Sequence, residues 1–151
     1  MIKKEQIQKK QEEKVAKEQK KSNPPVSHSV GRRKTAVARI WLRRGNGKIV
    51  VNNKDYTEYF DTDVSILSAA TPFRVCPAGT NYNVQATVRG GGKKAQADAV
   101  KLGIARALVN LDATFRTAFR KDKLLTVDSR QVERKKYGQR GARRKFQFVK
   151  R

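Results

Sequence analysis

Two segments of the chain alternate between apolar and polar residues, which is the pattern of β-strands buried on one face. Residues 35–43 (TAVARIWLR) put small and aliphatic side chains on one face. Their other face is mixed and carries Val37, Arg39, Trp41 and Arg43. Residues 82–89 (YNVQATVR) alternate in the same way. We predict a strand at each of the two segments.

A turn signal follows the first of these strands. Residues 45–47 (GNG) tolerate the positive φ angles that tight turns require. Residues 48–52 (KIVVN) then supply a short apolar run. We therefore predict that they return beside the first strand as the second half of a β-hairpin. A further edge strand is expected at residues 124–127.

The clearest helix signal begins after Lys94. Apolar residues recur there at the spacing of one helix face, at Ala97, Val100, Ile104, Ala107, Leu108 and Leu111. A stripe of this kind faces a sheet. Gly103 lies in the middle of the predicted helix, where it costs about 1 kcal/mol relative to Ala. We therefore expect that Gly103 allows another part of the backbone to approach closely.

Shorter helices have start signals of their own. Asp55 opens a capping-box pattern, with a glutamate three residues later. Thr62 is placed to cap a second helix over residues 63–70. Pro72 is expected to end that helix, because proline has no N–H group to continue it. Asp112 is placed to cap a third short helix.

The two ends of the chain carry no such periodicity. Residues 1–21 are rich in Lys, Gln and Glu without an apolar stripe, which predicts a frayed helix or coil. The following segment (SNPPVSHS) contains two prolines and is expected to be a linker. We therefore divide the chain into a basic extension and linker at 1–29, a globular domain at 30–128 and an arm at 129–151.

The C-terminal arm is also set apart by its charge. The 151 residues include 36 Lys or Arg and 13 Asp or Glu, which gives a formal net charge of +23. Residues 130–151 hold ten of these cations and one acid, Glu133. Charges this dense repel one another unless a polyanion neutralises them. We predict a long, extended basic arm that becomes ordered against nucleic acid.

Cations also cluster on predicted loops of the globular domain. These clusters are Arg32, Arg33 and Lys34; Arg43 and Arg44; and Lys93 and Lys94. The predicted turn between a strand and the long helix consists of Gly90, Gly91 and Gly92. Such a turn either exposes N–H groups to phosphate or serves as a tight connection. Both interpretations stay open, and we assign the cation clusters to nucleic-acid binding.

The sequence lacks the residue patterns of an enzyme or a metal protein. His28, the only histidine, lies in the predicted linker, and Cys76, the only cysteine, is expected to be a buried thiol. Neither a Walker A loop nor a metal-binding motif occurs. We predict no catalytic residue, metal, cofactor or small-molecule substrate. No apolar run approaches the roughly 18 residues of a membrane span, and no signal or transit peptide is recognisable, so we expect a cytoplasmic protein.

Five motifs together resemble a known family. They are GRRKTAVAR at 31–39, NGKIVVN at 46–52, VRGGGKKAQADAV at 88–100, RQVERKKYGQRGARR at 130–144 and the final Lys-Arg. In order and spacing they are similar to the small-subunit ribosomal protein family numbered nine (S-nine), in its bacterial form. The resemblance implies an α+β fold, a two-layer sandwich in which helices cover one face of a small mixed sheet. It also implies a left-handed crossover, an exception to the usual rule.

The resemblance further implies partners and contact residues. The partners are 16S-type ribosomal RNA, other proteins of the small-subunit head and the tRNA at the peptidyl site. The arm residues placed on ribosomal RNA are Arg130, Gln131, Arg134, Lys135, Lys136, Arg140, Arg143, Arg144 and Lys145. Lys150 and Arg151 are expected to approach the tRNA, although Val149 stands where the family commonly has Ser. A bacterial ribosome is expected, and an organellar one stays open.

Charge alone leaves other interpretations open. A general nucleic-acid chaperone or compaction protein would need the same charge, but it should bind DNA and unrelated RNA equally well. A phosphate-transferring enzyme that uses residues 90–92 would need an acidic metal cluster or a base, and the sequence offers neither. The arm aromatics Tyr137, Phe146 and Phe148 either stack on bases or pack within the arm.

Overall fold

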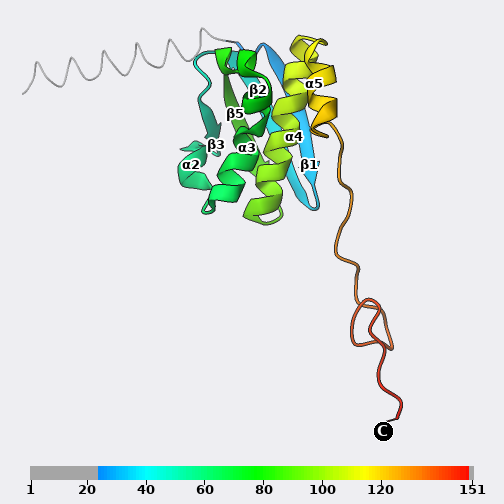
Figure 1. Ribbon diagram of the computed structural model, residues 1–151. Coiled ribbons are helices and arrows are strands. Elements are labelled where there is room, and N and C mark those ends of the chain that lie inside the picture. The colour runs from blue at the N-terminus through cyan, green and yellow to red at the C-terminus, as the bar shows by residue number, and fades with distance from the viewer. Residues whose placement is uncertain (1–23, 150–151) are drawn as a thin grey trace, which may run out of the picture.

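The computed structural model describes residues 24–149, which form a five-stranded sheet with helices (Figure 1). The strands are β1 (Ser27–Arg33), β2 (Ala36–Arg44), β3 (Ile49–Val51), β4 (Lys54–Asp55) and β5 (Tyr82–Arg89). The helices are α2 (Tyr56–Tyr59), α3 (Asp63–Val75), α4 (Lys93–Leu111), α5 (Phe115–Lys121) and the short 3-10 helix η1 (Pro77–Asn81). The frayed helix or coil expected at residues 1–21, and the terminal Lys150 and Arg151, lie outside the described residues.

The sheet is mixed, with the strand order β1-β2-β5-β3-β4. β2 is antiparallel to both β1 and β5, whereas β3 is parallel to β5. The helices α3, α4 and α5 lie on one face of the sheet (Figure 1). α4 packs against β1 and β2, and α3 packs against α4. The predicted α+β fold with helices on one face of a small mixed sheet is confirmed.

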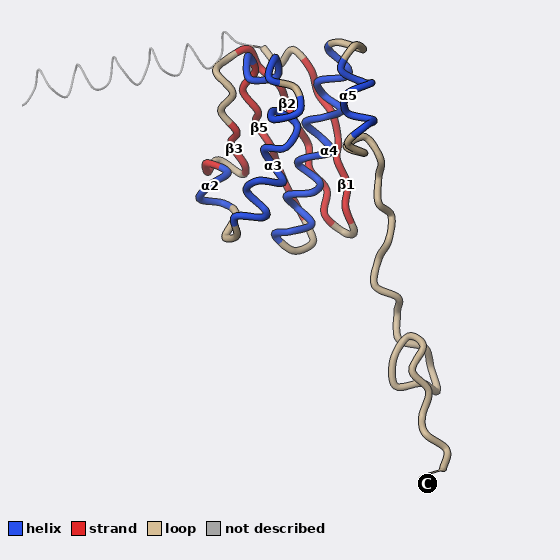
Figure 2. The backbone as a smooth tube through the Cα atoms, viewed as in Figure 1, coloured by secondary structure: helices blue, strands red, loops and turns tan. Residues whose placement is uncertain are grey.

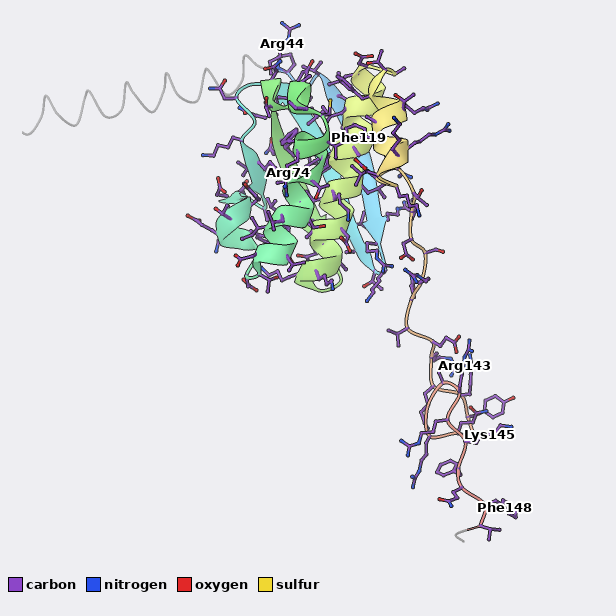
Figure 3. All side chains as sticks on the ribbon, in the orientation of Figure 1. Arg44, Arg74, Phe119, Arg143, Lys145 and Phe148 are labelled. Carbon is purple, nitrogen blue, oxygen red and sulfur yellow. The ribbon has the colours of Figure 1, made fainter. Side chains whose placement is uncertain are left out.

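The connection between the two parallel strands is left-handed. β2 ends at Arg44, which lies at the top of Figure 3, so β2 runs upwards in this view. β5 is antiparallel to β2 and β3 is parallel to β5, so both run downwards. The connecting α3 lies in front of the sheet, and β5 lies to the right of β3 (Figure 1). When the strands run downwards and the helix lies in front, a right-handed connection would place β5 to the left of β3. The expected left-handed crossover is therefore present.

The core lies between the sheet and the helices, as the alternation predicted. The inward positions of β2 are all fully buried, at Ala36, Ala38, Ile40 and Leu42. The facing residues of α4 are buried as well, at Ala97, Val100, Ile104, Ala107 and Leu108. β2 therefore presents a buried face to the helices and keeps its other face towards solvent.

α4 approaches β1 most closely at two glycines. A Cβ atom added to Gly31 would lie 1.9 Å from the carbonyl oxygen of Ala99 and 2.6 Å from the backbone nitrogen of Gly103. A Cβ atom on Gly103 would lie 2.5 Å from Cγ1 of Ile40. The hydroxyl of Ser29 donates to the Gly103 carbonyl at 2.5 Å. The close backbone approach predicted for Gly103 is confirmed, and its partner is β1.

The first strand was missed by the sequence analysis. Ser27–Ser29 were expected to lie in the linker, but they begin β1. The basic cluster expected on a loop before the first strand instead lies partly in β1 and partly in the turn at Lys34. β1 shows no apolar alternation because its inward positions carry Ser29 and Gly31. These residues are small because α4 passes so close to them.

The predicted hairpin was also wrong. β3 forms at residues 49–51, but it pairs with β5 and β4 and not with β2. The connection from β2 wraps around the side chain of Asn83, at the start of β5. The amide oxygen of Asn83 accepts hydrogen bonds from the backbone N–H groups of Asn46 at 2.9 Å and Lys48 at 3.0 Å. Residues 45–47 therefore lead the chain past the start of β5 and do not close a hairpin with β2.

Two helix ends differ from the prediction. α3 continues three residues past Pro72, whose ring is fully buried. The N–H of Cys76 donates to the Pro72 carbonyl at 3.0 Å and closes the last turn. Asp112 lies at the C-terminal end of α4 and does not cap α5 directly. Its carboxylate accepts from the N–H of Thr114 at 2.9 Å, which turns the chain between the two helices.

The chain after α5 forms neither helix nor strand as far as residue 149 (Figure 2). The edge strand predicted at 124–127 was wrong. Leu124 is buried instead, and its N–H donates to the Phe119 carbonyl at 2.9 Å after Lys123 adopts a positive φ of 54°. This turn directs the chain away from the sheet, so residues 124–127 have no strand to pair with.

Candidate nucleic-acid interface

Three predicted cationic clusters meet at one end of the sheet. The β1–β2 turn lies beside the glycine turn, because a Cβ atom on Gly90 would lie 2.5 Å from the Thr35 carbonyl oxygen. The arm leaves the body at the same place, where Nε2 of Gln131 donates to the Lys34 carbonyl at 3.3 Å. The cluster at Arg44 lies at the opposite end of β2 (Figure 3). The fold thus gathers cations from three parts of the sequence, and we call this region the basic end.

Arg33 is engaged inside the basic end. Its Nη2 lies 3.1 Å from Oδ2 of Asp128, and its Nε lies 3.9 Å from Oδ2 of Asp98. Its Nη1 donates to the main-chain carbonyls of Asp128 and Arg130, each at 3.3 Å. Only 19% of the Arg33 side chain is exposed, whereas Arg32 is exposed. Arg33 therefore fastens the start of the arm to the body, and the RNA contact predicted for it competes with these bonds.

Geometry explains two of the three glycines in the turn between β5 and α4, Gly90 and Gly91. Gly90 and Gly91 have positive φ angles of 73° and 66°, and both approach the start of β2 closely. A side chain at Gly91 would lie 3.0 Å from Cβ of Ala36. Gly92 is the N-cap residue of α4 and makes no side-chain cap, and a Cβ atom added to it would meet no neighbouring atom within 4 Å. The tight-turn interpretation is confirmed, and phosphate binding stays a prediction.

The two lysines that begin α4 differ in their surroundings. Nζ of Lys93 donates to the Tyr59 carbonyl at 2.6 Å and lies 3.8 Å from the centroid of the Tyr59 ring. This contact joins α2 to the start of α4. Lys94 is exposed. Of the pair, Lys94 is the cation that can reach a phosphate without breaking an internal contact.

Two cations of the arm form ion pairs, one with the last residue of the globular domain and one within the arm. Nη2 of Arg130 lies 2.7 Å from Oδ2 of Asp128. Glu133 accepts hydrogen bonds from Arg143, at 2.5 Å from Nη2 and 3.0 Å from Nε. The hydrogen bonds from Arg130 hold the pKa of Asp128 well below its usual range. Those from Arg143 lower the pKa of Glu133. The only acid of the arm is therefore already paired with one of its cations.

The Glu133–Arg143 pair closes a loop within the arm, visible in Figure 1. The N–H of Arg140 donates to the Arg144 carbonyl at 2.9 Å inside this loop. The side chains of Arg143 and Lys145 lie far from the sheet (Figure 3). The other predicted RNA contacts of the arm are exposed as well, namely Gln131, Arg134, Lys135, Lys136, Arg140 and Arg144.

Aromatic side chains accompany these cations. Tyr137 is 92% exposed and Phe148 is fully exposed. Phe146 is 58% exposed, and the guanidinium of Arg140 lies 5.5 Å from its ring centroid. Tyr137 and Phe148 therefore do not pack within the described arm, which favours the stacking interpretation for both. Phe146 has a partner inside the arm.

Other arginines were not included among the predicted contacts. Arg39 and Arg89 are diagonal neighbours on β2 and β5, on the face of the sheet that no described helix covers. Arg106, Arg116 and Arg120 from α4 and α5 line a hollow of about 550 Å³ beside β1. These residues are isolated in the sequence, so cluster counting misses them. The alternation along β2 placed Arg39 on the outer face, and that was the only available signal.

The described residues offer no catalytic arrangement. Cys76 is buried, as predicted. His28, expected in a linker, lies in β1 with its ring centroid 5.3 Å from that of Trp41. Within residues 24–149 no three His, Cys, Asp or Glu side chains gather where they could hold a metal ion. None of the helices in that range is long and apolar enough to cross a membrane.

The fold and its surface are those of a small, strongly basic α+β protein whose cations gather at one end of the sheet. The family model described as ribosomal protein S9/S16 matches residues 31–151. The chain therefore belongs to the ribosomal protein S9 family, and the resemblance noted in the sequence is confirmed. Because this is a family of structural ribosomal proteins, the chain is a structural protein and not an enzyme.

Similar proteins come from several bacteria, and each of the three described next is called small ribosomal subunit protein uS9. The chain is 48% identical over 126 residues to that of Cytophaga hutchinsonii, covering 83% of this chain and 98% of the relative. It is 50% identical over 124 residues to that of Thermus thermophilus, covering 82% and 97%. The protein of Treponema pallidum is 52% identical over 121 residues, covering 80% and 94%.

Proposed function

We propose that the protein is a structural component of the head of the small ribosomal subunit, where it binds 16S-type ribosomal RNA. Family membership supports this proposal, as does the name shared by its relatives. The single observation that carries it is the gathering of three cationic segments at the basic end of a folded body. Phosphate contacts fix the position of such a body on RNA and supply most of its affinity.

The body and the arm have different roles in this proposal. On the body, the exposed Arg32, Lys34 and Lys94 contact phosphates, with the glycine turn beside them. The arm, residues 129–151, passes between RNA helices because its described part has neither helix nor strand and because its charged residues are ten cations and a single acid. Its exposed Tyr137 and Phe148 are available to stack on unpaired bases.

We further propose that the end of the arm reaches the tRNA at the peptidyl site. Lys150 and Arg151, the last two residues, supply the cations that approach the tRNA backbone. Other head proteins are its neighbours in the particle. Deleting residues 149–151 should leave incorporation into subunits intact and weaken tRNA binding at this site. Unchanged tRNA affinity in truncated particles would count against the tRNA contact only.

Sedimentation tests the main proposal. A cell extract is separated on a density gradient at moderate salt, and the protein is located by immunoblot. It should run with the small subunit. A protein absent from those fractions, or spread over all nucleic acid, would indicate a general compaction protein instead.

Salt dependence tests the physical basis of binding. The logarithm of the binding constant for a head-domain RNA should fall linearly with the logarithm of salt concentration, with a slope of roughly −0.7 to −0.9 per neutralised phosphate. The same measurement is made with DNA of equal length. Equal affinity for the RNA and the DNA would contradict ribosomal specificity.

A further inference from the structure

The outer face of the sheet is cationic and carries no acid in its three longest strands. β1, β2 and β5 contain six arginines and no Asp or Glu. The alternation directs Arg32, Arg39 and Arg89 away from the core, and all three are exposed. The helices occupy the other face (Figure 1), so they do not account for this concentration of charge.

The strand register brings these groups together. Arg89 of β5 lies opposite Val37 of β2, and Thr87 lies opposite Arg39. Trp41 is the next outward residue along β2, about 7 Å from Arg39 at the usual rise of a strand. Cations, a hydroxyl and an aromatic ring therefore occupy neighbouring positions on one surface.

This surface is hollowed. A hollow of about 420 Å³ is lined by Val37, Arg39 and Trp41 of β2, by Thr87 and Arg89 of β5, and by Gly90. Its volume falls within the range of small-ligand sites, about 300–1,000 Å³. The lining contains no acid. The hollow also adjoins the glycine turn, so it is continuous with the basic end.

Trp41 is the only tryptophan of the chain, and it is half-buried on the outer face of β2. Its one ring partner is His28, with centroids 5.3 Å apart and the planes inclined at 44°. The hydrophobic core lies on the other side of the strand. Packing against the helices therefore does not explain why the largest aromatic residue stands at this position.

We propose that the hollow binds one unpaired nucleotide of ribosomal RNA, with the base stacked on Trp41 and the adjoining phosphates on Arg39 and Arg89. The site rests on the proposed function, to which it adds a surface on which one base stacks. Charge complementarity selects a polyanion, since a face that exposes Arg32, Arg39 and Arg89 and carries no acid in β1, β2 or β5 would repel a basic ribosomal protein. Unpaired RNA is selected over duplex because its bases are free to stack on aromatic side chains.

The single tryptophan makes the test direct. The full-length chain is titrated with a transcript of the head domain of 16S RNA while the emission of Trp41 is recorded. Stacking on a base should quench this emission with the same midpoint as binding measured by filter retention. High salt should reverse both signals.

Single substitutions test whether the residues of the hollow are responsible for the RNA affinity and its salt dependence. Trp41→Thr should weaken binding about fivefold or more, because stacking of one base contributes at least that factor. Trp41→Phe should retain most of the affinity, which excludes a general loss of structure. Arg39→Gln should lower the slope of the salt dependence by about one. Arg74→Gln removes the same charge from α3 on the helical layer (Figure 3) and should leave the slope unchanged.

The possible results separate this site from the proposed function. Normal RNA binding with unquenched Trp41, and with Trp41→Thr equal to the original protein, overturns the site alone. Failure of the unmodified chain to bind the RNA overturns the proposed function as well. If RNA does not change the emission of Trp41 but assembly into the subunit shields Trp41 from solvent, a protein occupies the hollow. The proposed nucleotide site is then wrong.

Discussion

Replacing Gly103 with alanine tests the close packing of α4 on the sheet. In a helix without close neighbours this change would stabilise the protein by about 1 kcal/mol. Here the new Cβ atom would lie 2.5 Å from Cγ1 of Ile40 and 3.4 Å from the nitrogen of Gly31. Ile40 is fully buried and cannot move aside, and overpacking typically costs about 1–3 kcal/mol. We expect the free energy of unfolding to fall by about 1 kcal/mol, the difference between the two effects.

A second substitution reverses the sign. Ile40→Ala removes the atom that Gly103→Ala would strike, and by itself it should cost about 2–5 kcal/mol because it leaves a cavity. In that background, Gly103→Ala should stabilise the protein by about 1 kcal/mol, because only the helix preference remains. The coupling energy between the two sites is then about 2 kcal/mol, as expected for residues in contact.

Urea unfolding of the full chain at fixed salt measures all four proteins, with Trp41 emission as the signal. Gly141→Ala in the arm is the control, since the nearest atom to a new Cβ there is 3.6 Å away. It should not change the unfolding midpoint. If Gly103→Ala stabilises the original protein, or has the same effect in both backgrounds, the reasoning from close packing is refuted.

Three further predictions concern the arm and the core. Arg33→Ala should lower the free energy of unfolding by about 1–3 kcal/mol, because charge-assisted bonds to Asp128 are lost. Trypsin should then cleave the chain faster near Asp128, and unchanged cleavage would contradict the role of Arg33 in fastening the arm. Phe119→Ala should cost about 3–5 kcal/mol because Phe119 is fully buried, whereas Phe148→Ala should leave urea unfolding unchanged. The pKa of Glu133 is lowered by Arg143, so the stabilisation from this pair should be present above the unfolded Glu pKa of about 4.3 and lost as pH falls through the lower folded pKa. An NMR titration of the Glu133 carboxyl checks this, and an ordinary pKa would show that the pair does not form in solution.

Much of the fold follows from periodicity, and the errors have a common cause. β2, β5 and α4 were found because one face of each is apolar and buried. β1 was missed because Ser29 and Gly31 occupy its inward positions, where the approach of α4 leaves no room for larger side chains. The hairpin was wrong because Asn83, distant in sequence, fixes the path of the turn. Both errors arise from contacts between segments that local patterns do not record.

The candidate interface divides in the same way. Runs of cations, such as those of the arm, are visible in the sequence because their members are adjacent. Arg39, Trp41 and Arg89 become one surface only through the register of β2 and β5. Arg33 looked like its neighbours in the sequence, but the fold uses it to fasten the arm through Asp128.

The order of the residues along the chain is enough to predict a basic α+β domain with an unpatterned cationic arm, and its motifs indicate the family. Composition and local spacing suffice for these properties, because charge and periodicity are carried by neighbouring residues. Where the cations meet, which of them are already paired and which face of the sheet the described helices leave uncovered became visible only in the folded chain. Those properties depend on strand order and on the close packing of α4 against Gly31, which bring together residues far apart in the chain.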